Sequence, residues 1–140
     1  MRYLDTSIIV TALTREQNTG RIRTWLGEQS AGALAISLWV ITEFSAALSI
    51  KLRMRQMTTE DRSLALAAFS RLARKSFRIL AIDQEEFRAA AIFSDAYELG
   101  LRAGDALHVV IASKIGAELV TSDRDMARAS SALGVPTLLL

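Results

Sequence analysis

Four acidic residues occupy positions where a carboxylate could do chemistry. Asp5 follows a short apolar run directly, and Asp123 stands at the end of the run Leu119-Val120-Thr121-Ser122-Asp123. Glu43 is the only charged residue between Gln29 and Ile50, and Asp105 begins another apolar stretch. A carboxylate among apolar residues costs free energy unless a cation or a hydrogen-bond donor accompanies it. These acids are therefore candidates for a functional site.

Four carboxylates gathered in one place repel one another, and a divalent cation would relieve that repulsion. The chain has no Cys and a single His, His108, so thiolate sites and zinc sites with several imidazoles are excluded. Oxygen-only ligands favour Mg²⁺ or Mn²⁺, which lower the pKa of a bound water and brace a phosphodiester. The predicted reaction class is metal-assisted hydrolysis of a nucleic-acid backbone.

Each acid also has a purely structural explanation. Asp105 and Asp123 could stabilise the N-termini of helices, a contribution of roughly 0.3 to 1 kcal/mol each. Asp5 could be a turn residue before a helix capped by Thr6 or Ser7. Glu43 could form a buried ion pair with a distant Arg. Four such coincidences in one chain are less probable than one shared function.

Short apolar runs alternate with longer segments of helical period. The runs are too short for helices and lack polar alternation, so they predict strands covered on both faces, as in a parallel sheet. The predicted strands are residues 2–4, 33–36, 78–82, 118–121 and 137–139. The predicted helices are residues 6–13, 19–29, 38–55, 59–75, 84–99, 105–115 and 124–133.

Strands separated by helices predict right-handed crossovers and a helix-sheet-helix sandwich. Ser37 and Thr58 are placed to cap helix N-termini, and Gly100, Gly116 and Gly134 fall where left-handed C-terminal residues are expected. Ligands of such folds bind beyond the carboxyl ends of the strands. Asp5 and Asp123 follow two of those ends, so we expect the four acids to meet at that edge.

Composition and length restrict the class of protein further. A length of 140 residues with 51% hydrophobic and 23% charged residues predicts one compact domain, residues 1–140. The formal charge of +2 is too small to indicate a nucleic-acid partner. Residues 31–50 have the length of a membrane span, but Glu43 and several hydroxyl residues argue against one. No secretory signal is visible, so we expect a cytoplasmic protein.

The ordered set of motifs resembles the PIN-domain family, and within it the small ribonucleases that act as toxins of VapBC-type modules. The likeness extends over nearly the whole chain. It depends on the segments Tyr3-Leu4-Asp5-Thr6-Ser7, Ile41-Thr42-Glu43, Gly104-Asp105-Ala106-Leu107-His108 and Leu119-Val120-Thr121-Ser122-Asp123.

The resemblance implies a three-layer sandwich with a five-stranded parallel sheet and a Mg²⁺- or Mn²⁺-dependent endoribonuclease. It further implies a homodimer held inactive by a cognate antitoxin protein, with RNA as substrate and no membrane partner. By this resemblance the metal-ligating acids are Asp5, Glu43 and Asp105, with Asp123 as a more variable fourth acid. The supporting hydroxyls are those of Thr6, which would orient Asp5, and of Thr121 and Ser122.

Two alternatives stay open from the sequence. One is a PIN-like fold without catalysis that binds RNA or a protein. The other is a receiver-type signalling domain with Asp83 as phosphoacceptor, although Thr6 stands where such domains have a second acid. His108 lies three residues beyond Asp105 and is expected to be a packed histidine more than a proton shuttle. For Asp125 we expect a role in a first helical turn.

Overall fold

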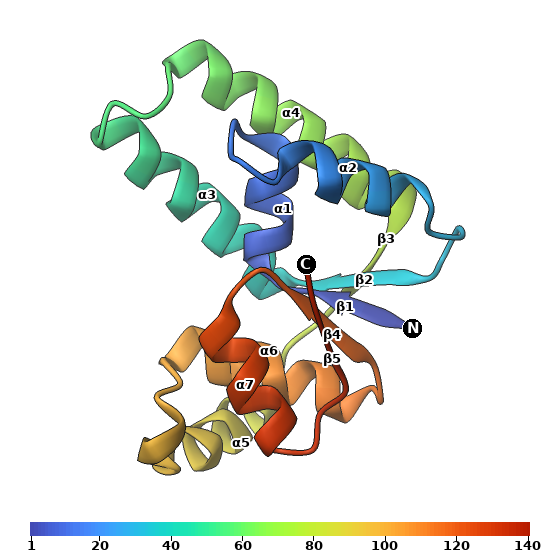
Figure 1. The fold of residues 1–140 in the computed structure, drawn as a ribbon, viewed down its shortest axis with the longest axis vertical. Helices are drawn as coiled ribbons and strands as arrows, with labels where there is room; N and C mark the ends of the chain where they lie inside the picture. The colour runs from blue at the N-terminus through green and yellow to red at the C-terminus, as the bar shows by residue number, and fades with distance from the viewer.

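Five parallel strands form one sheet in the order β3-β2-β1-β4-β5 (Figure 1). This arrangement comes from a computed structural model that describes residues 1–140. The strands are β1 (Arg2–Leu4), β2 (Leu34–Ser37), β3 (Phe77–Leu80), β4 (Glu118–Thr121) and β5 (Thr137–Leu139).

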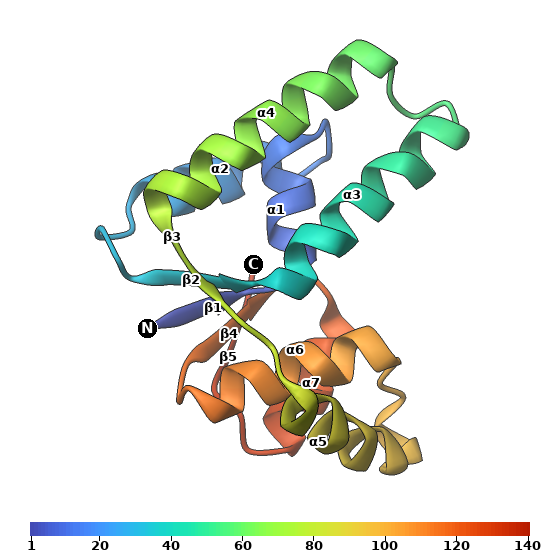
Figure 2. The same cartoon turned by 180° about the vertical axis from the view of Figure 1, so that it is seen from behind.

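Helices cover both faces of this sheet, which gives the three layers. On one face lie α1 (Thr6–Leu13), α2 (Thr19–Gly27), α3 (Leu38–Arg53) and α4 (Thr59–Ser76). On the other face lie α5 (Gln84–Asp95), α6 (Ala103–Lys114) and α7 (Arg124–Ala132) (Figure 2). The predicted fold class is confirmed.

The predicted elements are all present, with shifted ends. Helix α6 begins at Ala103, so Asp105 lies in its first turn and does not begin it. The helix expected to reach residue 99 ends at Asp95 and is followed by a 3₁₀ turn at Tyr97–Leu99. Left-handed glycines end elements at the three expected positions, 100, 116 and 134.

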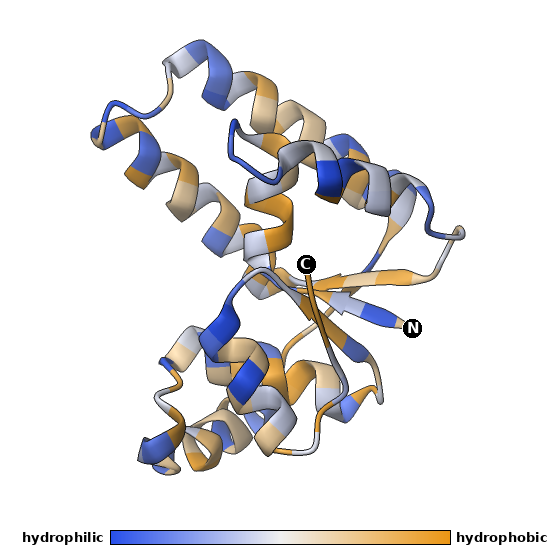
Figure 3. Ribbon diagram, viewed as in Figure 1, coloured by the Kyte–Doolittle hydropathy of each residue, from blue (hydrophilic) through white to orange (hydrophobic).

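The expectation that every strand is covered on both faces is wrong for the two edge strands. Ile79 in β3 and Leu139 in β5 are exposed, whereas all four residues of β2 are buried. The strands are largely hydrophobic (Figure 3), but an edge strand has a neighbour on only one side, which leaves part of its surface uncovered.

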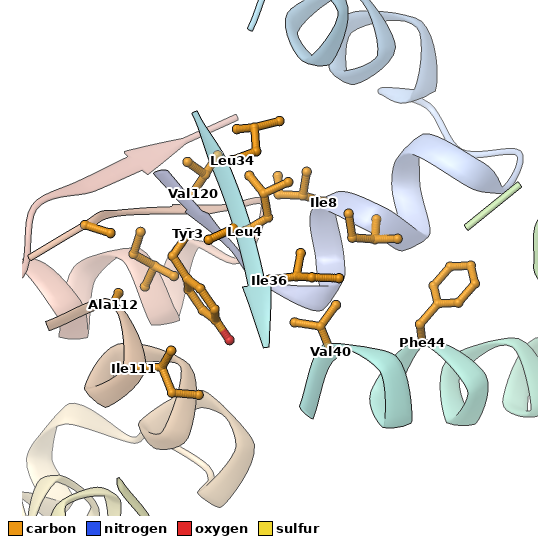
Figure 4. Packing of buried hydrophobic residues seen from close by; sticks show 14 of the residues in the cluster. Tyr3, Leu4, Ile8, Leu34, Ile36, Val40, Phe44, Ile111, Ala112 and Val120 are labelled. Atoms are coloured by element: carbon orange, nitrogen blue, oxygen red, sulfur yellow. The ribbon is translucent and has the colours of Figure 1, made fainter. Parts of the chain in front are cut away.

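The core lies on both sides of the central strands. In β1, Leu4 faces the side of α1, where Ile8 and Ile36 also pack, while Tyr3 extends toward α6 (Figure 4). Phe44 of α3 packs on Phe69 of α4 with ring centroids 4.5 Å apart. Residues 31–50, considered above as a membrane span, form β2 and α3, and no helix here combines the length and apolarity needed to cross a bilayer.

The order of the strands reverses between β1 and β4. The chain leaves β1 toward β2 and β3 and then crosses to β4 on the opposite side of β1. In open α/β sheets the connections diverge at this point and leave a crevice at the carboxyl ends of the strands. Asp5 directly follows β1, and Asp123 follows β4 after one intervening residue, Ser122.

Candidate active site

A pocket of about 330 Å³ opens at the carboxyl ends of β1 and β4. All four predicted acids line it, although they come from four separate segments of the chain. Arg102 is the only Lys or Arg at its wall. The remaining lining residues are Thr6, Ser7, Ala46, Ala47, Ile50, His108 and Met126.

Asp5 is held rigidly at the floor of this pocket. It is the N-cap of α1, where Oδ1 accepts from the Ile8 N–H at 3.3 Å and from the Ser7 hydroxyl at 2.7 Å. Oδ2 accepts from the Thr121 hydroxyl at 2.9 Å. Only 2% of Asp5 is exposed, and burial raises its pKa despite these donors. A nearby cation would favour its charged form.

Glu43 lies in the second turn of α3, with 28% of its side chain exposed. Its Oε2 accepts from His108 Nε2 at 2.7 Å and from the Thr6 hydroxyl. Burial pushes the pKa of Glu43 upward, but the contacts with His108 and Thr6 outweigh it and hold the pKa below its usual value. The alternative of a buried ion pair with an Arg is therefore wrong, because the side-chain partners of Glu43 are His108 and Thr6.

His108 joins the core to the pocket. The ring is 2% exposed, with Nε2 on Glu43 and Nδ1 on the Tyr3 hydroxyl at 2.9 Å. The Tyr3 hydroxyl also contacts Ser37 Oγ at 2.8 Å. Burial raises the pKa of Tyr3, so this hydroxyl stays protonated. His108 is packed as expected, yet it also touches a predicted site residue.

Asp105 and Asp123 serve as helix caps as well as pocket walls. Asp105 Oδ2 accepts from the Arg102 backbone N–H at 3.1 Å. Asp123 Oδ1 accepts from the N–H groups of Asp125 and Met126 at 2.8 and 3.0 Å. The other oxygen of each acid accepts no hydrogen bond from the protein. The structural explanation is thus correct for both, and it leaves one oxygen of each free.

The expected role of Thr6 is corrected by the structure. Its hydroxyl bonds Glu43 and not Asp5, because Thr6 lies in the first turn of α1 on the side that faces α3. Ser7 and Thr121 hold Asp5 instead. The spacing of two residues from Asp5 was the available signal for Ser7, since a hydroxyl there reaches back to an N-cap carboxylate.

Ser122 and Asp125 lie close to Asp123 in the sequence and have different partners. Ser122 donates its backbone N–H to Ser7 Oγ at 2.9 Å, while its own buried hydroxyl has no partner. Asp125 is exposed, pairs with Arg128 at 3.2 Å and is absent from the pocket wall, in line with the expected first-turn role.

Gly104 gives the Glu43 carboxylate room in the wall of the pocket. A Cβ at Gly104 would lie 2.7 Å from Glu43 Oε1 and 3.4 Å from Trp39 Nε1. The indole Nε1 of Trp39 is buried without a hydrogen-bond partner. Close approach of α3 to α6 therefore requires glycine here.

The donor set suits a hard divalent cation, because the acids supply oxygen ligands and buried Asp5 has no Lys or Arg partner. No three acidic or histidine side chains lie close enough together to hold a metal ion as they stand. Joint ligation would need the partly exposed Asp105, whose side chain is 23% exposed, to approach Asp5 and Glu43.

The family model for the PIN domain matches residues 2–131, almost the whole chain. The chain belongs to the PIN-domain family. A search of curated proteins finds no match to the sequence. The structure adds the arrangement of the domain's acids, since β1, α3, α6 and the end of β4 each bring one of them to the pocket.

Several solved structures share the fold of this PIN domain. VapC20 of Mycobacterium tuberculosis, a sarcin-ricin loop cleaving toxin, superposes with a TM-score of 0.75 at 17% identity, covering 100% of both chains. FitAcB from Neisseria gonorrhoeae superposes with a TM-score of 0.72 at 20% sequence identity, covering 99% of this chain and 96% of that chain. VapBC2 from Rickettsia felis, bound to a promoter DNA fragment, superposes with a TM-score of 0.68 at 20% sequence identity, covering 100% of this chain and 99% of that chain.

Proposed function

We propose that this PIN domain is a Mg²⁺- or Mn²⁺-dependent endoribonuclease. The observation that carries the proposal is the meeting of Asp5, Glu43, Asp105 and Asp123 at one pocket, with a single Arg beside them. Isolated helix caps would have no reason to share a pocket. The largely buried Asp5, with no Lys or Arg paired to it, is the strongest single element of the set.

Asp5, Glu43 and Asp105 would hold the cation, with Asp123 completing the set. Bound there, the cation supplies an activated water and offsets charge on the phosphodiester. Thr121 and Ser7 keep Asp5 in a fixed orientation, and Thr6 does the same for Glu43. Arg102, whose side chain is 86% exposed at the rim, would contact a substrate phosphate.

We infer that the biological role is that of the toxin in a type II toxin-antitoxin system. Support comes from the fold shared with VapC20, described as a cleaving toxin, and with VapBC2, described with a fragment of its promoter. The expected partners are a cognate antitoxin, a second copy of the chain and RNA.

The test is cleavage of RNA by the purified chain in Mg²⁺ or Mn²⁺, compared with EDTA. Cleavage that needs the cation and falls at least 100-fold in Asp5→Asn supports the proposal. Full activity in EDTA or in Asp5→Asn would contradict it. Calorimetry with Mn²⁺ separates the catalytically inactive alternative, because a module that only binds RNA or protein would show no cation site. The receiver alternative receives no support, since Asp83 caps α5 and lies outside the pocket.

A further inference from the structure

A buried chain of hydrogen bonds runs from the start of α3, through β1 and α6, and back to α3. Ser37 Oγ contacts the Tyr3 hydroxyl at 2.8 Å, and that hydroxyl contacts His108 Nδ1 at 2.9 Å. His108 Nε2 then meets Glu43 Oε2 at 2.7 Å. The first three residues of this chain are almost completely buried.

The direction of each hydrogen bond in this series follows from the Glu43 carboxylate at one end of it. A carboxylate at neutral pH only accepts hydrogen bonds, so His108 must donate to Glu43 from Nε2, which lies 2.7 Å from Glu43 Oε2. In the neutral ring Nδ1 is then an acceptor, which the Tyr3 hydroxyl satisfies by donating. Tyr3 in turn accepts from Ser37. With a neutral ring, this arrangement satisfies the hydrogen-bonding groups of Ser37, Tyr3 and His108.

The Ser37 hydroxyl takes part in this series of hydrogen bonds and does not cap its own helix. It occupies the N-cap position of α3, yet its side chain makes no capping hydrogen bond. A Ser at an N-cap normally stabilises its helix by about 1 kcal/mol through such a bond. The hydroxyl points to Tyr3 instead, so its place in the chain replaces an available capping bond.

We propose that His108, fixed by Tyr3 and Ser37 as the tautomer protonated on Nε2, is a positioning residue that orients the Glu43 carboxylate for cation binding. The inference rests on the proposed function, in which Glu43 is a ligand. Groups that orient metal ligands typically contribute 10- to 100-fold to metal affinity or activity. Without the Nε2–H, only the Thr6 hydroxyl still holds the Glu43 carboxylate, which then rotates more readily toward solvent.

The first test is nitrogen NMR of the imidazole in the metal-free protein at neutral pH. His108 is the only histidine, so a chain purified without a histidine tag gives one unambiguous signal pair. A proton on Nε2 and none on Nδ1 supports the proposal. A proton on Nδ1 overturns it, whatever the enzyme activity.

The second test compares Mn²⁺ affinity by calorimetry in His108→Leu, His108→Gln and His108→Asn. A Gln amide places an N–H near the position of Nε2, whereas an Asn amide reaches only to the position of Nδ1. We expect a loss of about 10- to 100-fold in His108→Leu and His108→Asn, and recovery to within a few-fold in His108→Gln. Equal affinities in Gln and Leu variants that melt like wild type overturn the proposal.

The buried position of His108 means that the Leu variant can fail to fold. Tyr3→Phe then serves, because it keeps the ring and removes only the hydroxyl that donates to His108 Nδ1 and accepts from Ser37. A fall of about three-fold or more in Mn²⁺ affinity supports the proposal, and unchanged affinity overturns it. If the wild-type chain binds no Mn²⁺ and cleaves no RNA, the proposed function fails, while the NMR result still decides the state of His108.

Discussion

The Thr121 hydroxyl donates to Asp5 Oδ2 at 2.9 Å and so ties the end of β4 to the end of β1. The Thr121 hydroxyl oxygen also accepts the backbone N–H of Asp123 at 2.9 Å. One hydroxyl therefore fixes the spacing between two of the four pocket acids. It does so at the point where the order of strands in the sheet reverses.

Replacing Thr121 by Val removes both hydrogen bonds and preserves the shape of the side chain. We expect a loss of about 1 to 3 kcal/mol in the free energy of unfolding, because buried Asp5 and the Asp123 N–H each lose a partner. RNA cleavage should fall about ten-fold or more. Thr121→Ser keeps the hydroxyl and should therefore retain most of the stability and most of the cleavage activity. Urea unfolding and cleavage assays measure the two effects, and a fully active Val variant would contradict this role.

Asp5→Asn should abolish cleavage and yet stabilise the protein in EDTA. Burial raises the pKa of Asp5, so the folded protein takes up this proton at a pH where the unfolded chain is still ionised. The Asp5 contribution to stability therefore falls as pH rises above the unfolded value of about 3.9 and through the raised folded value. In thermal melts in EDTA from pH 5 to 8, the melting temperature of the variant should rise relative to that of wild type as the pH increases.

The two proteins differ only at residue 5, so the difference between the two curves reports the effect of replacing the Asp5 carboxylate. Addition of Mn²⁺ should raise the melting temperature of wild type and not that of the variant. Parallel curves at all pH values in EDTA would show that Asp5 does not carry an uncompensated charge.

Gly104→Ala should displace Glu43 without unfolding the chain. The added Cβ would lie 2.7 Å from Glu43 Oε1, so the carboxylate must move out of its place beside His108. We expect cleavage and Mn²⁺ affinity to fall about ten-fold or more. The matched control is Gly20→Ala in α2, where a Cβ meets nothing within 4 Å, and which should leave both quantities unchanged. Equal activities in the two variants would contradict the close approach.

Thr58→Ala should lower stability and leave the pocket intact. Thr58 caps α4 by accepting the Asp61 N–H at 3.0 Å, and Asp61 accepts the Thr58 N–H in return. Loss of such a cap costs about 1 kcal/mol. Neither residue lines the pocket, so cleavage per folded molecule should equal that of wild type. Reduced cleavage at full folding would mean that α4 influences the site.

The sequence alone determined the succession of strands and helices. Buried runs such as residues 118–121 and glycines such as Gly134 are local signals, and the structure reproduces them within a few residues. The sequence also showed which acids follow strands. Parallel strands bring their carboxyl ends to one edge of the sheet, so these acids were expected to lie near one another. The candidate acids therefore followed from local pattern, and their shared pocket from the parallel topology.

Only the tertiary structure decided which groups hold those acids. Thr6 and Ser7 are neighbours in sequence, but the turn at the start of α1 sends one hydroxyl to Glu43 and the other to Asp5. The chain from Ser37 through Tyr3 to His108 joins residues 34 and 105 positions apart. Such contacts depend on how α3 and α6 pack against β1, and this packing is set by the whole core and not by any local stretch of residues.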